Sequence, residues 1–282
     1  MKGLKNIGNT CYLNAGLQML IQNKTLCKLI LDNSLNSDIL QKISNFIKEY
    51  YDSSNDSINP IEIKKIIESK QEIFQGFQQQ DSTEFILYLI NIIDEELVKN
   101  KSSHGIKTLF GINLNIRVKC KLKNCLKIYN HKEESNILLL DIQSNTKTLN
   151  DAYRNFKSSE KLDDDNKYFC ENCNHKNIAS KRTEIMSWPN YLFIWLKRYS
   201  QNGKYITKNS QDIEIPLNWR HNLELQGGVI HYGNLNGGHY VYIGKNNNKW
   251  YMFNDSSVSE IGTNEVENQL SKAYWLYYAK KN

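Results

Sequence analysis

The sequence predicts an α+β fold in which a helical lobe precedes a lobe built mainly of strands. In the first hundred residues, apolar side chains recur with the 3.6-residue period of amphipathic helices. After residue 106 they alternate with polar residues, as they do in half-buried strands. Two spaced cysteine pairs between residues 120 and 173 indicate that the strand-rich part carries a cysteine-tipped extension.

The composition is that of an ordinary globular protein. The chain has 282 residues, of which 40% are hydrophobic and 23% charged, which excludes a disordered or fibrous chain. No apolar run is long enough for a membrane span, and the first residues lack the apolar core of a signal peptide. Six cysteines are too few for a disulfide-stapled secreted scaffold, so we expect an intracellular protein of the cytoplasm or nucleus. The net charge of +6 comes without a dense basic cluster and supports nucleic-acid binding only weakly.

Periodicity and turn residues place the expected elements. We expect four helices in the first lobe: one capped by Thr10, one over 38–51, one after Asn59-Pro60 and one over 82–98. In the second part we expect a short helix over 149–157 and strands over 112–118, 137–142, 191–199, 228–232, 239–244, 249–253 and 273–279.

Cys11 is a candidate nucleophile. It follows Gly8-Asn9-Thr10 at a predicted helix start, where backbone N–H groups and the helix dipole favour a thiolate and lower the pKa of a cysteine. An isolated cysteine in such a place is more often a small buried side chain. The assignment therefore depends on a partner base.

His239 is the candidate base. It follows two glycines, which allow close approach of a ligand to the backbone, at the head of a predicted strand. A hairpin from 239 to 254 would bring Asn254 or Asp255 against the imidazole as the acceptor that orients it. Each feature alone has a structural explanation, but together they indicate nucleophilic catalysis by a cysteine. The residues leave the choice between Asn254 and Asp255 open.

Four motifs, spanning the chain from residue 3 to about 278 in family order, resemble those of the ubiquitin-specific proteases. The cysteine box is matched by GLKNIGNTCYLN at 3–14 and the glutamine–aspartate box by QQDSTEF at 79–85. The strand motif after the second cysteine pair is matched by FIWLKRY at 193–199, and the histidine box by LNGGHY at 235–240 with WYMFNDSSV at 250–258.

This resemblance implies a fold and an activity. The fold is that of a papain-like cysteine protease with a helical thumb, a β-rich palm and zinc-tipped β fingers. A single catalytic domain would cover 1–282, with the thumb at about 1–105, the fingers at about 106–190 and the palm at about 191–282. The activity is thiol-dependent deubiquitination, the hydrolysis of the bond after the C-terminal glycine of ubiquitin in ubiquitinated proteins. We expect a monomer that binds neither a membrane nor nucleic acid.

The resemblance also implies residue roles. Cys11 would be the nucleophile, His239 the base and Asn254 the third catalytic residue, with Asp255 beside it as a helper. Asn6 matches the asparagine whose amide donates to the developing oxyanion. The residues expected to contact the tail of ubiquitin are Gln80, Asp81, Glu84, Gly238 and Tyr240.

Asp81 and Glu84 have a second interpretation. They stand three residues apart at the start of the helix expected over 82–98, which is the spacing of a capping box. The pattern alone favours capping, whereas the resemblance places both carboxylates against the arginine-containing tail of ubiquitin. The two roles are compatible, because a carboxylate accepts several hydrogen bonds.

The cysteine pairs Cys120-x4-Cys125 and Cys170-x2-Cys173 predict a structural zinc site of four thiolates. The gap in the first pair is wider than the commoner two residues, so free thiols are the alternative. His131 and His175 are near enough in sequence to replace a cysteine as ligand. Catalysis is expected to need no cofactor.

Three other functions remain open on the sequence. The enzyme could hydrolyse another ubiquitin-like modifier, or the chain could be a ubiquitin-binding module with a weak catalytic site. Zinc-dependent nucleic-acid binding would explain the four cysteines but leaves Cys11 and His239 without an explanation.

Overall fold

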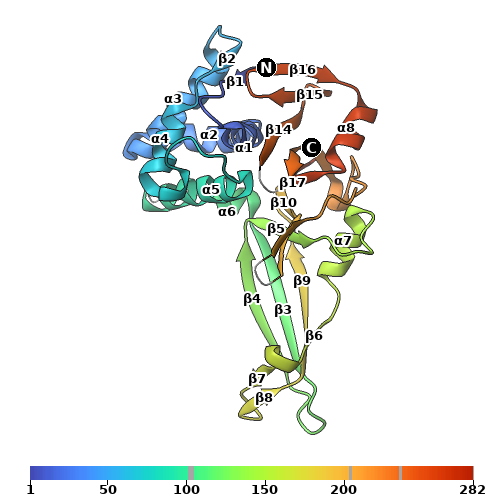
Figure 1. Cartoon of the computed structure of the whole chain (residues 1–282). Coiled ribbons are helices and arrows are strands. Elements are labelled where there is room, and N and C mark those ends of the chain that lie inside the picture. The colour runs from blue at the N-terminus through green and yellow to red at the C-terminus, as the bar shows by residue number, and fades with distance from the viewer. Residues whose placement is uncertain (101–104, 203–204, 235–236, 282) are drawn as a thin grey trace.

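The computed structural model describes residues 1–100, 105–202, 205–234 and 237–281, so Leu235 and Asn236 of the expected histidine box lie outside it. The predicted α+β fold is confirmed. A helical lobe stands beside a seven-stranded sheet, and a long narrow extension of strands projects from their junction (Figure 1).

The helical lobe contains all four predicted helices. Its first helix, α1, is buried along its whole length because it runs between α5 and the sheet strand β14. Two short strands pair in parallel across this lobe and hold the segment just before α1. The elements are β1 Gly3–Leu4, α1 Cys11–Ile21, α2 Lys24–Asp32, α3 Asp38–Asp52, β2 Ser57–Ile58, α4 Ile61–Lys70, α5 Ser82–Lys99 and α6 Ile106–Phe110.

One predicted helix cap is wrong. Thr10 precedes α1, but its side chain accepts no hydrogen bond from the helix. Its hydroxyl instead accepts from the N–H of Ile7 and donates to the side chain of Asn6, which stabilises the preceding loop. Asp81 is a true cap, because its carboxylate accepts from the N–H of Thr83 at the start of α5.

The seven-stranded sheet has the order β16-β15-β14-β13-β17-β10-β5. All neighbours are antiparallel except β10 and β5. The last strand along the chain, β17, therefore lies inside the sheet, between β13 and β10. The elements are β5 Ile137–Asp141, α7 Leu149–Phe156, β10 Tyr191–Lys197, β13 Leu223–Asn234, β14 Gly237–Asn246, β15 Lys249–Asn254, β16 Ser257–Ile261, α8 Thr263–Leu270 and β17 Ala273–Lys280.

The extension is a four-stranded antiparallel sheet of order β4-β3-β9-β6, with a small hairpin at its tip (Figure 1). Only β3 matches a predicted strand. Its elements are β3 Ile112–Cys120, β4 Ile128–Ser135, β6 Glu160–Leu162, β7 Tyr168–Cys170, β8 His175–Asn177 and β9 Ala179–Ser187, and a separate hairpin after β10 pairs β11 Tyr199–Asn202 with β12 Tyr205–Lys208.

The seven-stranded sheet separates two hydrophobic cores. Alternate residues of its strands point to opposite faces, so Phe193 and Trp275 pack against the helical lobe while Ile194 and Leu276 pack on the other side, with α7 and α8. The indole N–H of Trp275 donates to the hydroxyl of Thr83 in α5 at 3.1 Å and ties the sheet to the helical lobe. Among the described residues, no helix combines the length and the apolar character needed to cross a membrane.

Candidate active site

Asn6 organises the loop that leads to Cys11. Its side-chain oxygen accepts from the N–H groups of Gly8, at 3.2 Å, and Thr10, at 3.1 Å. Gly8 and Asn9 both have positive φ angles, +113° and +52°, which turn the chain sharply into α1. Cys11 is the first residue of that helix.

The Cys11 thiol is buried, with 4% of the residue exposed. Burial raises the pKa of the thiol and outweighs the backbone N–H groups, that of Tyr240 first, which lower it; the Asp255 carboxylate raises it further. The expectation that the helix start gives a lowered pKa is therefore wrong. Burial therefore opposes formation of the Cys11 thiolate, and a base is needed to make Cys11 a nucleophile.

The predicted hairpin brings His239 and Asn254 together. His239 lies near the start of β14 and Asn254 ends β15, its antiparallel partner. His239 Nε2 is 2.7 Å from Asn254 Oδ1. Because that oxygen only accepts, Nε2 carries the proton and Nδ1 is left as the basic nitrogen. In the described residues no hydrogen bond joins the Cys11 thiol to His239.

Asp255 points away from His239. Its φ angle of +50° turns the chain after β15, and its two oxygens accept from Asn6 Nδ2 at 2.8 Å and from Asn14 Nδ2 at 2.7 Å. Asn14 was not predicted as a site residue. The signal for it is its position on α1 three residues after Cys11, which puts both side chains on one face of the helix.

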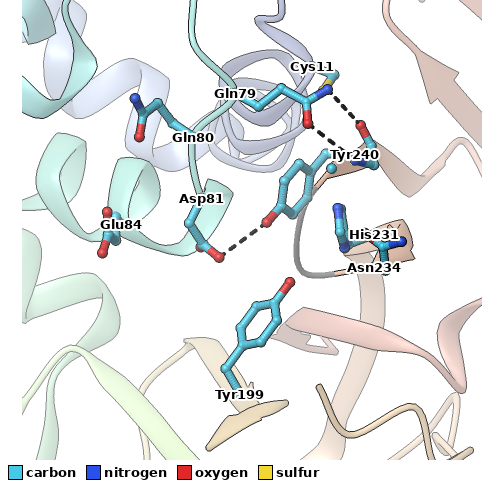
Figure 2. Close-up of a pocket in the computed structure, with 11 residues that line it drawn as sticks. Cys11, Gln79, Gln80, Asp81, Glu84, Tyr199, His231, Asn234 and Tyr240 are labelled. Carbon is cyan, nitrogen blue, oxygen red and sulfur yellow. Dashed lines mark hydrogen bonds between the residues drawn. The ribbon is translucent and has the colours of Figure 1, made fainter. Parts of the chain in front are cut away.

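A cleft of about 430 Å³ lies between the helical lobe and the sheet (Figure 2). Cys11 lies at one end, and acidic and aromatic side chains line the rest. All five predicted tail-contact residues line this cleft, together with Tyr199 and His231, which were not predicted. Its lining residues are Cys11, Gln79, Gln80, Asp81, Glu84, Tyr199, His231, Asn234, Gly237, Gly238 and Tyr240.

Asp81 acts as a helix cap, as the capping interpretation predicts, whereas Glu84 does not. Asp81 caps α5 with one oxygen and accepts from the hydroxyl of Tyr240 at 3.2 Å with the other. Glu84 does not return a hydrogen bond to Asp81, so the reciprocal capping box is absent from the described residues. Burial, and then Asp81, raises the pKa of Glu84. Its carboxylate faces the cleft without a protein partner in the described structure.

The glycines before His239 have different neighbours from those expected. A Cβ at Gly238 would lie 2.3 Å from His231 Nε2 and 2.1 Å from the Tyr232 carbonyl, so β13, and not a ligand, makes the close approach. The peptide groups of Gly238 pair with Gln79, whose amide donates to the Gly238 carbonyl and accepts from its N–H, both at 3.2 Å. Gln80, the predicted glutamine, has no such bond among the described residues.

The four cysteines meet at the tip of the extension. Their sulfurs lie within 4.8 Å of one another and form a group that could hold a metal ion. Cys125 Sγ and Cys170 Sγ are 3.7 Å apart. Neither His131 nor His175 belongs to this group as far as the structure is described. Two neighbours hold the sulfurs in place: Tyr129 Oη lies 3.5 Å from Cys170 Sγ, and the Asn172 amide donates to Cys125 Sγ at 3.4 Å.

Comparison with known proteins gives matches over nearly the whole chain. The family model for ubiquitin carboxyl-terminal hydrolases matches residues 2–278. Relatives include the probable ubiquitin carboxyl-terminal hydrolase 16 of Schizosaccharomyces pombe, 28% identical over 99% of this chain and 67% of its own length. Ubiquitin carboxyl-terminal hydrolase 16 of Arabidopsis thaliana is 29% identical over 99% of this chain but only 30% of its own length. Ubiquitin carboxyl-terminal hydrolase 12 of Salmo salar is 27% identical, over 99% and 90% respectively.

Solved structures show the same fold. A chain of the SAGA DUB module Ubp8/Sgf11/Sus1/Sgf73 bound to monoubiquitin superposes with a TM-score of 0.84 at 27% identity and covers 100% of this chain and 69% of its own. The corresponding module bound to ubiquitin aldehyde gives 0.82 at 26% identity, over 100% and 70%. The match to the family model across nearly the whole chain, with these neighbours, confirms the predicted resemblance: the chain belongs to the ubiquitin carboxyl-terminal hydrolase family and is a thiol-dependent deubiquitinating protease.

Proposed function

We propose that this chain hydrolyses the bond after the C-terminal glycine of ubiquitin, with Cys11 as nucleophile, His239 as base and Asn254 as the residue that orients it. The observation that carries the proposal is the His239–Asn254 hydrogen bond of 2.7 Å. The residue after His239 in β14, Tyr240, directs its N–H to Cys11 and so places the imidazole near the thiol. Gln80, Asp81, Glu84, Gly238 and Tyr240 form the path of the ubiquitin tail along the cleft.

The chemistry begins with proton transfer from the Cys11 thiol to His239 Nδ1. The thiolate adds to the carbonyl carbon of the last glycine, and the second N–H of the Asn6 amide, whose first is held by Asp255, donates to the oxyanion. Protonated His239 gives its proton to the departing lysine amine, which leaves a thioester on Cys11. A water molecule deprotonated by His239 then hydrolyses the thioester and restores the thiol.

The four-cysteine group fits a structural zinc ion, and we propose that it holds one. Four sulfurs about 2.3 Å from a central ion lie about 3.8 Å apart, close to the 3.7 Å that separates Cys125 Sγ and Cys170 Sγ. Bound zinc would supply a cross-link between the β3–β4 turn and the β7–β8 hairpin. Catalysis needs no cofactor.

The remaining expectations belong to the same proposal. The chain forms one catalytic domain, with a thumb at about 1–105, fingers at about 106–190 and a palm at about 191–282. It acts as a monomer inside the cell, in the cytoplasm or nucleus, without binding a membrane or nucleic acid. The thiol chemistry proposed for Cys11 and the free cysteines support a reducing compartment.

A ubiquitin with a thiol-reactive group at its C-terminus tests the activity. It should modify Cys11 alone, as mass spectrometry of the digested protein would show, and Cys11→Ala should abolish turnover while ubiquitin binding remains. The buried Cys27, whose pKa burial raises to about 12, is the internal control and should stay unmodified. Labelling of Cys27, or full activity of Cys11→Ala, would contradict the assignment. Faster cleavage of another ubiquitin-like modifier in parallel assays would change the substrate.

A further inference from the structure

Gln79 bridges the two lobes at the catalytic end of β14. It lies in the segment before α5, 159 residues from Gly238 in sequence. Its planar side-chain amide pairs with both peptide groups of Gly238, the residue immediately before His239 (Figure 2). This two-bond pairing has the form of the hydrogen-bonded pair found between antiparallel strands.

The edge of β14 explains why such a partner is needed. β15 pairs with β14 only from Tyr242 to Asn246, so within the described part of the chain residues 238–241 have no strand on that side. Peptide groups of alternate strand residues point to the same edge. Gly238, Tyr240 and Tyr242 therefore direct their peptide groups to the same edge of β14. At this edge Tyr242 pairs with β15, the N–H of Tyr240 points to Cys11, and both peptide groups of Gly238 bond to Gln79.

Both partners are themselves held in place. On the side of Gln79, the Asn9 amide donates to the Phe77 carbonyl at 2.8 Å, and the buried Lys64 ammonium donates to the Gly76 carbonyl at 2.7 Å. On the side of Gly238, β13 pairs through Gly233, whose carbonyl accepts from Lys208 Nζ at 2.7 Å. Gln79 thus joins two fixed supports.

We infer that Gln79 is a positioning residue for the reaction: it substitutes for a strand at the open edge of β14 and so fixes His239 and the Tyr240 N–H relative to Cys11. The inference depends on the proposed roles of Cys11 and His239. Gln79 does not act on the reacting atoms. Its two hydrogen bonds restrict the position of the strand end that carries the base.

The test replaces Gln79 by Met, which keeps the length and bulk of the side chain but can form neither hydrogen bond. Loss of two net hydrogen bonds at one strand end should lower kcat for a fluorogenic ubiquitin substrate about tenfold. KM should change less than about twofold, because binding of the tail uses other residues. The melting temperature should fall by no more than a few degrees, because only two hydrogen bonds of an exposed side chain are lost. Gln78→Met is the matched control: Gln78 is exposed, lies outside the cleft and makes no side-chain hydrogen bond within the described residues.

A second measurement does without ubiquitin. Alkylation of Cys11 by iodoacetamide, followed by mass spectrometry of its peptide, should be several-fold slower in Gln79→Met than in the wild type or Gln78→Met. If the wild type failed to cleave ubiquitin, the proposed function would fall, but the alkylation comparison would still test Gln79. A change in KM alone would show that Gln79 only contacts substrate. That result, or an unaltered alkylation rate, would overturn the inference.

Discussion

The neighbouring residues Asn254 and Asp255 serve opposite sides of the site. Asn254 bonds to His239, whereas Asp255 bonds to Asn6 and Asn14 on the side of the nucleophile. Asn254 is the last residue of β15, whereas Asp255 lies in the turn that follows, and its positive φ angle directs its side chain away from His239. Asn254 therefore orients the imidazole proposed as the base, and Asp255 orients the amide proposed as the oxyanion donor.

The separate contacts of Asn254 and Asp255 predict which pairs of substitutions lower kcat through the same interaction. Asp255→Ala should lower kcat roughly tenfold or more by releasing the Asn6 amide, and Asn6→Ala about 10²-fold by removing the donor. Because Asp255 acts through Asn6, the double variant should be no slower than Asn6→Ala alone. Asn254→Ala should lower kcat more than Asp255→Ala and should combine independently with Asn6→Ala. A double-mutant cycle on kcat checks both statements. Additive losses for Asn6 and Asp255 would contradict the coupling.

Glu84 gives a prediction about substrate affinity. Its carboxylate faces the cleft and makes no hydrogen bond among the described residues. If it binds the arginine-bearing tail of ubiquitin, Glu84→Gln removes a charge-assisted hydrogen bond, typically roughly 1.5–3 kcal/mol. KM should therefore rise by at least about tenfold. The melting temperature should not change. Glu95→Gln, an exposed position on the same helix, should leave KM unaltered. Equal KM values for both variants would leave Glu84 without a role in binding.

At the scale of elements, apolar periodicity predicted the helices and strands whose apolar residues lie on one face toward a core. The helix over 82–98 buries one face, and the strand over 112–118 half-buries one, so their apolar spacing reveals them. Strands β4, β6, β8 and β9 were missed because the extension is solvated and polar, and its strands carry few apolar residues. Helix α8 was missed because only Val266 and Leu270 are buried in it.

The candidate site was predictable in part from the sequence. The motifs located Cys11, His239 and the hairpin that joins His239 to its acceptor. The choice of Asn254 over Asp255, and of Gln79 over Gln80, depends on backbone direction at single residues, for which the sequence has no periodic signal. The raised pKa of Cys11 depends on burial by the whole fold, which outweighs the local effect of the helix start.

The tip of the extension should depend on the zinc ion proposed for its four cysteines. The β7–β8 hairpin has three residue pairs and a half-exposed Phe169, so it has little core of its own. Replacing Cys170 and Cys173 by Ser should remove about one zinc ion per chain and lower the melting temperature, because metal binding is coupled to folding. Metal analysis by mass spectrometry and thermal unfolding with and without a chelator measure both effects. Protein prepared without chelators that holds no zinc would show that packing alone stabilises the tip.

For the whole molecule, the stability of the fold should depend on a buried histidine. His231 is 8% exposed and its ring packs at a tilt against that of Tyr240. Lys208 Nζ lies 3.1 Å from its Nδ1, and Asp81 is nearby across the cleft. Burial, and then Lys208, lowers the pKa of His231 from 6.5 to about 4. The folded protein therefore keeps this ring neutral at a pH where the unfolded chain already binds a proton.

The sign of the pH effect follows from this difference. The stabilisation is fully present above pH 6.5, where both states are neutral, and is lost as the pH falls from 6.5 toward 4. Between about pH 7.5 and pH 5 the loss should be about 2 kcal/mol. Urea unfolding at both pH values should show a smaller difference for His231→Gln. His131→Gln, at a side chain 72% exposed, should behave as the wild type. An unchanged difference in His231→Gln would assign the pH dependence to other groups.

The place of β17 has a consequence for the synthesis of this protein. Residues 273–280 fill the gap between β13 and β10, so a growing chain that lacks them has two separate partial sheets. Trp275, which joins the sheet to α5, is also missing from such a chain. Cys11 is synthesised well before β17, so the sheet that carries its proposed base is completed only after residue 280 has left the ribosome. We therefore expect no proteolytic activity from nascent chains that still lack β17.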